Sequence, residues 1–140
     1  MGSPGAEQVL ADRLLAAVRT ACLALPRVSE RVSHGRPAFF VGGRWFAGFM
    51  ADHHGDGRLA LWYAAPPGVQ AELIELEPDR FFRPPYVGHR GWVGVLLDTL
   101  DAEELRAVCE SAWACSAAPA ALAERGRASG DGPGQAPASG

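Results

Sequence analysis

Hydrophobic residues at helical spacing open the chain. Leu10, Leu14 and Val18 recur every three or four positions within the range Ala6 to Leu25, which is the period of one face of an α-helix. Pro26 follows directly and does not continue a helix. The pattern therefore predicts a first helix from about residue 6 to residue 25, with its apolar face turned toward a core.

From Val28 onward the period shortens to that of strands. Gly42-Gly43 separates two apolar and aromatic runs, Ala38 to Val41 and Trp45 to Ala51, as the turn of a β-hairpin does. Asp56-Gly57 is a second turn signal, and the run Leu59 to Ala64 behind it has the composition of a third strand. These three strands, each following the last through a short turn, predict an antiparallel meander.

The second half of the chain predicts a short helix, one more strand and a final helix. The helix begins after Pro66-Pro67-Gly68 and ends near Glu77, and prolines hold Phe81 to Tyr86 extended. The strand covers Trp92 to Leu97. Asp101 with Glu104 has the spacing of a capping box that starts the final helix.

Together these elements predict an α+β fold in which N- and C-terminal helices back an antiparallel sheet. Residues 1–118 form one domain, because 140 residues with 48% hydrophobic content support a single core. Residues 119–140 are rich in Ala, Gly, Pro and Ser, so we expect a tail that is disordered from Gly126 to Gly140. The strand phenylalanines belong to the core: Phe39, Phe46, Phe49, Phe81 and Phe82.

Composition sets the expected compartment and the state of the thiols. The chain has no apolar run long enough to span a bilayer and no signal-like start, so we expect a cytoplasmic location and no membrane contact. Cys22, Cys109 and Cys115 are odd in number and fall on predicted helices. We expect buried, reduced thiols.

The type of cationic side chain in this sequence is unusual, whereas its net charge is not. All 13 cationic side chains are arginine, while the net charge is −3. A GC-rich genome explains arginine and alanine without any function, and the net acidity argues against indiscriminate coating of nucleic acid. Any nucleic-acid binding would have to be local.

Metal-capable atoms gather at one turn. Asp52, His53, His54 and Asp56 lie close together in sequence, but adjacent histidines on a strand point to opposite faces. The turn itself accounts for the two aspartates. We therefore expect neither a metal nor a cofactor.

No catalytic set is evident either. Ser29 and Ser33 lie near His34, but no nucleophile elbow surrounds them. Cys109 has apolar helical neighbours, which is typical of an inert thiol. We expect a protein that is not an enzyme.

Three segments together resemble the MmcQ/YjbR family of small bacterial proteins. They are SHGRPAFFVGGRWFAGF, DHHGDGRLALW and APPGVQAELIELEPDRFFRPPYVGHRGWVGV, and the resemblance runs from about Ala6 to Trp113. It implies an α+β fold similar to the frataxin-like (CyaY-like) domain and a double-wing DNA-binding motif. One member of the family belongs to an antibiotic biosynthesis cluster, which implies a drug-binding or self-protection role as the alternative. The chain departs from the family at AWACSAAPAALAERGR, where a short basic terminus is expected.

The first functional hypothesis is weak binding of double-stranded DNA by wings around residues 34 to 58 and 83 to 92. Arginine on a hairpin can grip phosphates. The competing interpretation is that these arginines pair with Glu30, Asp52, Asp56 and Asp79, or that they cover apolar sheet. The predicted DNA-binding residues are Arg36, Arg44, His53, His54, Arg58, Arg83, His89 and Arg90.

The second hypothesis is a groove for a planar small molecule, either a metabolite or an antibiotic. Aromatic walls with a few polar anchors suit such a ligand, although strand aromatics often pack the core instead. The predicted groove residues are His34, Trp45, Trp62, Tyr86, Arg90 and Trp92.

Overall fold

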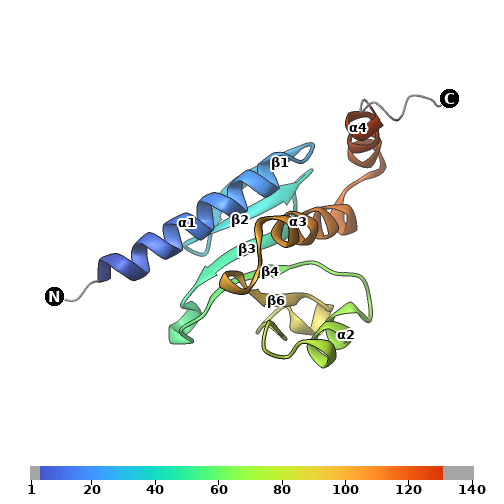
Figure 1. The fold of residues 1–140 in the computed structure, drawn as a ribbon. Coiled ribbons are helices and arrows are strands. Elements are labelled where there is room, and N and C mark those ends of the chain that lie inside the picture. The colour runs from blue at the N-terminus through green and yellow to red at the C-terminus, as the bar shows by residue number, and fades with distance from the viewer. Residues whose placement is uncertain (1–3, 131–140) are drawn as a thin grey trace.

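The computed structural model describes residues 4–130, which form one six-stranded antiparallel sheet with helices packed on it (Figure 1). This arrangement confirms the predicted α+β class. The helices are α1 (Pro4–Leu23), α2 (Val69–Leu76), α3 (Ala102–Ser116) and α4 (Pro119–Gly130). The strands are β1 (Val28–Ser33), β2 (Arg36–Val41), β3 (Arg44–Ala51), β4 (Leu59–Tyr63), β5 (Phe81–Phe82) and β6 (Val93–Leu96). Single 3₁₀ turns are η1 (His53–Gly55), η2 (Gly88–Arg90) and η3 (Leu97–Thr99).

The strands lie in the order β1-β2-β3-β4-β6-β5, and each pairs antiparallel with its neighbour. Gly42 and Gly43 join β2 to β3 with φ values of 56° and 82°. Two successive residues with positive φ make a turn whose twist matches that of the flanking strands. The predicted hairpin is confirmed, as are β3 and β4 to within one residue.

Strand β1 was not predicted. It lies at the edge of the sheet, where its polar and apolar residues alternate only weakly in burial. Its connection to β2 is a second two-residue turn, His34-Gly35, with φ values of 53° and 78°. A histidine in this conformation is uncommon, so the sequence signal for the hairpin is weak.

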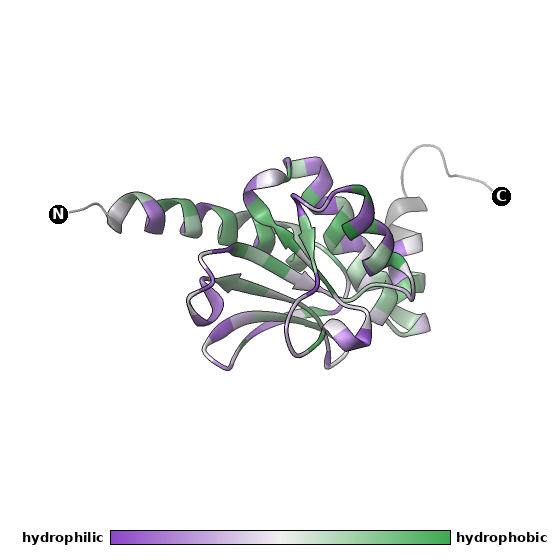
Figure 2. Ribbon diagram, turned by 90° about the horizontal axis from the view of Figure 1, so that it is seen from below, coloured by the Kyte–Doolittle hydropathy of each residue, from purple (hydrophilic) through white to green (hydrophobic). Residues whose placement is uncertain are grey.

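Helices α1 and α3 cover one face of the sheet, which we call the helix face (Figure 1). Val18 and Cys22 of α1 and Cys109 and Trp113 of α3 are fully buried in its core. The predicted capping box begins α3: Asp101 accepts from the Glu104 backbone N–H at 2.7 Å, and Glu104 accepts from the Asp101 N–H at 3.0 Å. The first turns of α1 extend beyond the sheet (Figure 2), and none of the described helices is long and apolar enough to cross a lipid bilayer.

The opposite face, which we call the open face, carries a separate group of buried residues. They are Met50, Ala60, Trp62, Ala64, Val87 and Trp92. Of the predicted core phenylalanines, four are buried on the helix face. The prediction is wrong for Phe82, which is half-buried on the open face under the Arg58 guanidinium at 3.9 Å.

The thiol prediction holds for two cysteines. Cys22 and Cys109 are buried and free, whereas Cys115 is exposed. A hydrogen bond with Cys109 and burial both raise the pKa of the Cys22 thiol. Cys22 is therefore a protonated core residue at neutral pH.

The predicted tail begins too early. Residues 119–130 form α4, and Ala121 packs into the helix-face core. Arg27 pairs with Glu124 at 3.0 Å, and the Arg125 guanidinium lies over the Trp113 ring. These contacts join residues far apart in the sequence, which composition does not report. The remainder of the predicted tail, residues 131–140, lies outside the described residues.

Candidate functional site

A pocket of about 540 Å³ lies on the open face. Its lining comes from the last residue of β1, from β2, β3 and β4, from the two connections at one end of the sheet and from the loop between β5 and β6. The lining residues are Ser33, His34, Arg36, Pro37, Ala38, Phe40, Trp45, Met50, His53, His54, Trp62, Tyr86 and Val87. This volume falls within the range of small-molecule sites, and most of the lining is apolar.

Two of the residues that line the pocket, Ala38 and Trp62, belong to one row of paired residues across the sheet. Ala38 pairs with Gly48, Gly48 with Trp62, and Trp62 with Gly94, so that one row crosses four strands. A Cβ at Gly48 would lie 3.0 Å from Met50 Cε and 3.3 Å from Trp45 Cζ2. Glycine therefore lets these two side chains lie close over the sheet.

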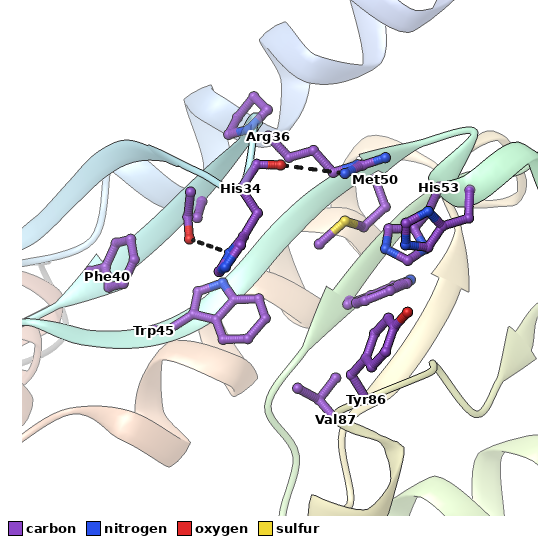
Figure 3. Close-up of a pocket in the computed structure, with 13 residues that line it drawn as sticks. His34, Arg36, Phe40, Trp45, Met50, His53, Tyr86 and Val87 are labelled. Atoms are coloured by element: carbon purple, nitrogen blue, oxygen red, sulfur yellow. Dashed lines mark hydrogen bonds between the residues drawn. The ribbon is translucent and has the colours of Figure 1, made fainter.

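Trp45 is the best-anchored wall of the pocket. Its Nε1 donates to the Ala47 carbonyl at 2.9 Å, and its ring contacts Trp92 with centroids 4.3 Å apart. Figure 3 shows Trp45 and Tyr86 on opposite sides of the hollow, with Met50 between them. Since the Trp45 ring has protein partners on its edge and one side, it is positioned before any ligand arrives.

A glutamine of α2 joins two points of the loop of residues 83–92, whose Val87 and Trp92 are also buried in the open-face group. Gln70 Nε2 donates to the carbonyls of Gly88 at 2.8 Å and Trp92 at 2.6 Å. This loop carries Tyr86 and Val87 to the pocket. The Tyr86 side chain remains 69% exposed, so it forms the rim of the pocket rather than part of the core.

His53, His54 and Tyr86 cluster above Trp62. The His53 ring lies 4.1 Å from that of His54, 4.6 Å from that of Trp62 and 5.9 Å from that of Tyr86, measured between centroids. The indole Nε1 of Trp62 is buried and has no hydrogen-bond partner within the described part of the chain. A buried donor without a partner is costly, and it is an observation that the fold alone does not explain.

The charge of His53 depends on its surroundings. Burial lowers the pKa of His53, the neighbouring His54 and Arg36 lower it further, and Asp56 raises it in part. The imidazole of His53 is therefore neutral at pH 7, with capacity to take up a proton when an anion approaches.

Strained backbone gathers around the pocket. Of the described non-glycine residues, five have positive φ, and three of these line the pocket: His34 at 53°, His54 at 51° and Tyr86 at 68°. Asp52, at 54°, adjoins the lining residue His53. Each such residue costs about 1 kcal/mol or more, and such strain is concentrated at functional sites in proteins.

The structure brings together four residues of the predicted groove: His34, Trp45, Trp62 and Tyr86. It does not place Arg90 or Trp92 in the lining, because Trp92 is buried beneath Trp45 and the Arg90 guanidinium lies 5.6 Å from the Trp92 ring. The sequence analysis did not name Phe40, Met50 and Val87, which also line the pocket.

The predicted DNA-binding residues divide between the two ends of the sheet. Arg36, His53 and His54 line the pocket, at the end that also carries the Arg58 loop. Arg44 begins β3 at the other end, where Trp45 meets Trp92, and Arg90 lies beside Trp92. Two further predicted DNA-binding residues, Arg83 and His89, are exposed.

The expected alternation of the two histidines is wrong. Residues 53–55 form a 3₁₀ turn rather than a strand, and left-handed backbone at His54 brings both rings to one pocket. The two aspartates are used by the turn: Asp52 Oδ1 accepts from the Gly57 N–H at 2.6 Å and Asp56 Oδ1 from the Arg58 N–H at 2.9 Å. Within residues 4–130, no three His, Cys, Asp or Glu side chains form a group that could hold a metal ion.

One serine–histidine contact lies at the pocket rim. Ser33 Oγ is 3.3 Å from His34 Nδ1, and Arg36 donates to the His34 carbonyl at 3.4 Å (Figure 3). A nucleophile of this kind needs a third group that orients the histidine. No described side chain other than Ser33 hydrogen-bonds to the His34 ring.

Comparisons with known proteins agree with this fold. A family model described as YjbR matches residues 23–115. The crystal structure of the Deinococcus radiodurans protein DR2400, a domain of the DUF419 family, is similar at 25% sequence identity with a TM-score of 0.60. The similar region covers 71% of this chain and 75% of that one. No curated protein sequence matches the chain significantly.

Proposed function

The chain belongs to the YjbR family, and we propose that it is a non-enzymatic protein that binds a planar aromatic small molecule in the pocket of the open face. The observation that carries this proposal is a preformed cavity of about 540 Å³ with one tryptophan wall, Trp45, already fixed by protein contacts. Preorganised walls reduce the entropy that binding would otherwise cost.

Binding would occur by stacking. A flat ring lying between Trp45 and Tyr86 would contact the apolar lining of the pocket and bring apolar surface out of water. The buried Trp62 adds a third aromatic surface near the His53 end. The strained residues Tyr86 and His54 support this proposal, because their backbone places both side chains at the pocket.

A matched pair of variants tests the site. Tyr86 and Leu76 are both 69% exposed, but only Tyr86 lines the pocket. Three probes of one shape are titrated by calorimetry: 2-naphthoate, 2-naphthamide and the cation of 2-naphthylmethylamine. We expect at least one to bind with a Kd of about 0.1–1 mM. We expect Tyr86→Ala to weaken that binding about fivefold, and Leu76→Ala to leave it unchanged.

The proposal fails if none of the three probes binds at concentrations up to about 5 mM, well above the expected Kd. It also fails if Leu76→Ala weakens binding as much as Tyr86→Ala does. Tyr86→Phe keeps the ring and should retain binding, which separates stacking from any role of the hydroxyl group.

DNA binding is the second candidate, and one observation favours it. No described carboxylate lies within salt-bridge distance of Arg36, Arg44, Arg83 or Arg90. In contrast, Arg58 lies 4.0 Å from Asp56 and stacks on Phe82, as the competing structural interpretation expects.

The test of this candidate is fluorescence anisotropy of a labelled mixed-sequence duplex at two salt concentrations. DNA binding predicts affinity that falls steeply with salt and weakens in Arg90→Ala, which removes a phosphate contact. Absence of binding at low salt removes the candidate.

A further inference from the structure

We infer that the ligand of the pocket is an anion, a planar aromatic acid whose acidic group lies among Arg36, His53 and His54. This inference rests on the proposed function and adds the chemical class of the ligand. The group consists of basic side chains from the start of β2 and from the connection between β3 and β4, which meet at one end of the pocket.

The side chains in the lining that can carry a charge near pH 7 are all basic. The lining contains His34, Arg36, His53 and His54, and it contains no aspartate or glutamate. Apolar and aromatic residues make up most of the rest. A pocket of this composition favours a negative charge at one end and a flat apolar body along the remainder.

The nearest carboxylates are already engaged. Asp52 accepts from the Gly57 N–H at 2.6 Å, and Asp56 accepts from the Arg58 N–H at 2.9 Å. Asp56 also lies 4.0 Å from the Arg58 guanidinium. Neither aspartate lines the pocket, so neither neutralises the basic group from inside.

Arg36 has donors to spare. Its one hydrogen bond to a described residue is to the His34 carbonyl at 3.4 Å, which is long for a charged donor. A guanidinium carries five N–H donors in a fixed fork that fits a carboxylate or a phosphate. Because Arg36 is half-buried in the pocket lining, an anion there would be less screened by water than on an open surface and could accept two parallel hydrogen bonds from the guanidinium.

The experiment compares probes that share a naphthalene ring and carry either an acidic group or a neutral one. We titrate 2-naphthoate, 2-naphthyl phosphate and the neutral 2-naphthamide by calorimetry at pH 7. We expect the better of the two anions to bind at least fivefold more tightly than the amide. The ranking of carboxylate and phosphate then identifies which acidic group the pocket prefers.

Two arginine variants supply the control. Arg36→Gln should weaken binding of the anions about tenfold, which corresponds to about 1.4 kcal/mol, and leave the amide unchanged. Arg44→Gln removes the same charge from an exposed position outside the pocket and should change neither. The inference is overturned if the amide binds as tightly as the anions, or if Arg36→Gln weakens all probes equally. Failure of all probes, in contrast, overturns the proposed function itself.

Discussion

Trp113 and Trp62 occupy the two faces of one sheet and are both buried, yet their surroundings differ. Trp113, on the helix face, is fully buried and its Nε1 donates to the Pro26 carbonyl at 2.9 Å. Trp62, on the open face, is 3% exposed and its Nε1 has no partner among the described residues. The first indole completes a closed core, whereas the second belongs to a surface with unused hydrogen-bonding capacity.

The two tryptophans differ in their surroundings because different elements cover the two faces of the sheet. Helices α1 and α3 close the helix face, and the polar groups at the start of α3 are capped. In the described part of the chain, the open face has no such helices over it; the loop of residues 83–92 covers part of it, and a pocket of about 540 Å³ lies there. The comparison leads us to expect that the helix face contributes most of the stability, whereas the open face carries the binding site that we propose.

The largest expected effect separates the two faces by stability. Trp113→Ala removes a fully buried ring and leaves the Pro26 carbonyl unpaired, so we expect a loss of about 3–5 kcal/mol in the free energy of unfolding. Trp45→Ala removes a half-buried wall of the pocket and should cost about 1–2 kcal/mol. Urea denaturation of both variants measures the difference. Equal losses would show that the two faces are not distinct in this way.

A smaller effect separates two glycines of the open face. A Cβ at Gly94 would overlap the Phe82 ring, whereas at Gly48 it would approach the flexible end of Met50 at 3.0 Å. We expect Gly94→Ala to lower the unfolding free energy by about 1–3 kcal/mol and Gly48→Ala by less than about 1 kcal/mol. Thermal unfolding of the pair checks this order, and the reverse order would contradict the described packing of the Phe82 ring on Gly94.

The smallest expected effect is a pH dependence from His53. Because burial, His54 and Arg36 lower its pKa in the folded state while Asp56 offsets this in part, the unfolded chain binds the proton more readily. The contribution of His53 to the free energy of unfolding is therefore fully present above the ordinary histidine pKa of about 6.5, and it is lost as the pH falls below that value. We expect a contribution of less than about 1 kcal/mol between pH 8 and pH 5.

The measurement is the unfolding free energy of wild type and His53→Gln at both pH values. The variant should show a smaller loss at pH 5 than wild type does. His89→Gln alters an exposed histidine outside the pocket and serves as the control. An unchanged pH dependence in His53→Gln would show that another group carries it.

The elements that sequence predicts well are those with strong local signals. Gly42-Gly43 fixes its hairpin, and Asp101 with Glu104 fixes the start of α3, because turn and cap chemistry act over a few residues. Strand β1 was missed since an edge strand has no buried face to impose a pattern. Helix α4 was missed because its packing depends on distant residues, as Arg27 with Glu124 illustrates.

The candidate site was predicted in part for the same reason. Trp45, Trp62 and Tyr86 are recognisable as ring-bearing residues beside turns, and the structure brings them together. The position of His53 depends on a turn with left-handed backbone, and the position of Trp92 depends on a loop that hydrogen-bonds to α2. Neither backbone conformation could be predicted from the local sequence. Tertiary contacts therefore decided which polar residues joined the pocket.

The most direct test of the binding face is a ¹H–¹⁵N spectrum of the tryptophan indole groups during titration with 2-naphthoate. We expect the Trp45 and Trp62 signals, which come from the pocket, to shift progressively. The Trp113 signal, from the opposite face, should stay in place and acts as an internal control. Shifts confined to Trp113, or no shift at any tryptophan, would contradict a ligand site on the open face.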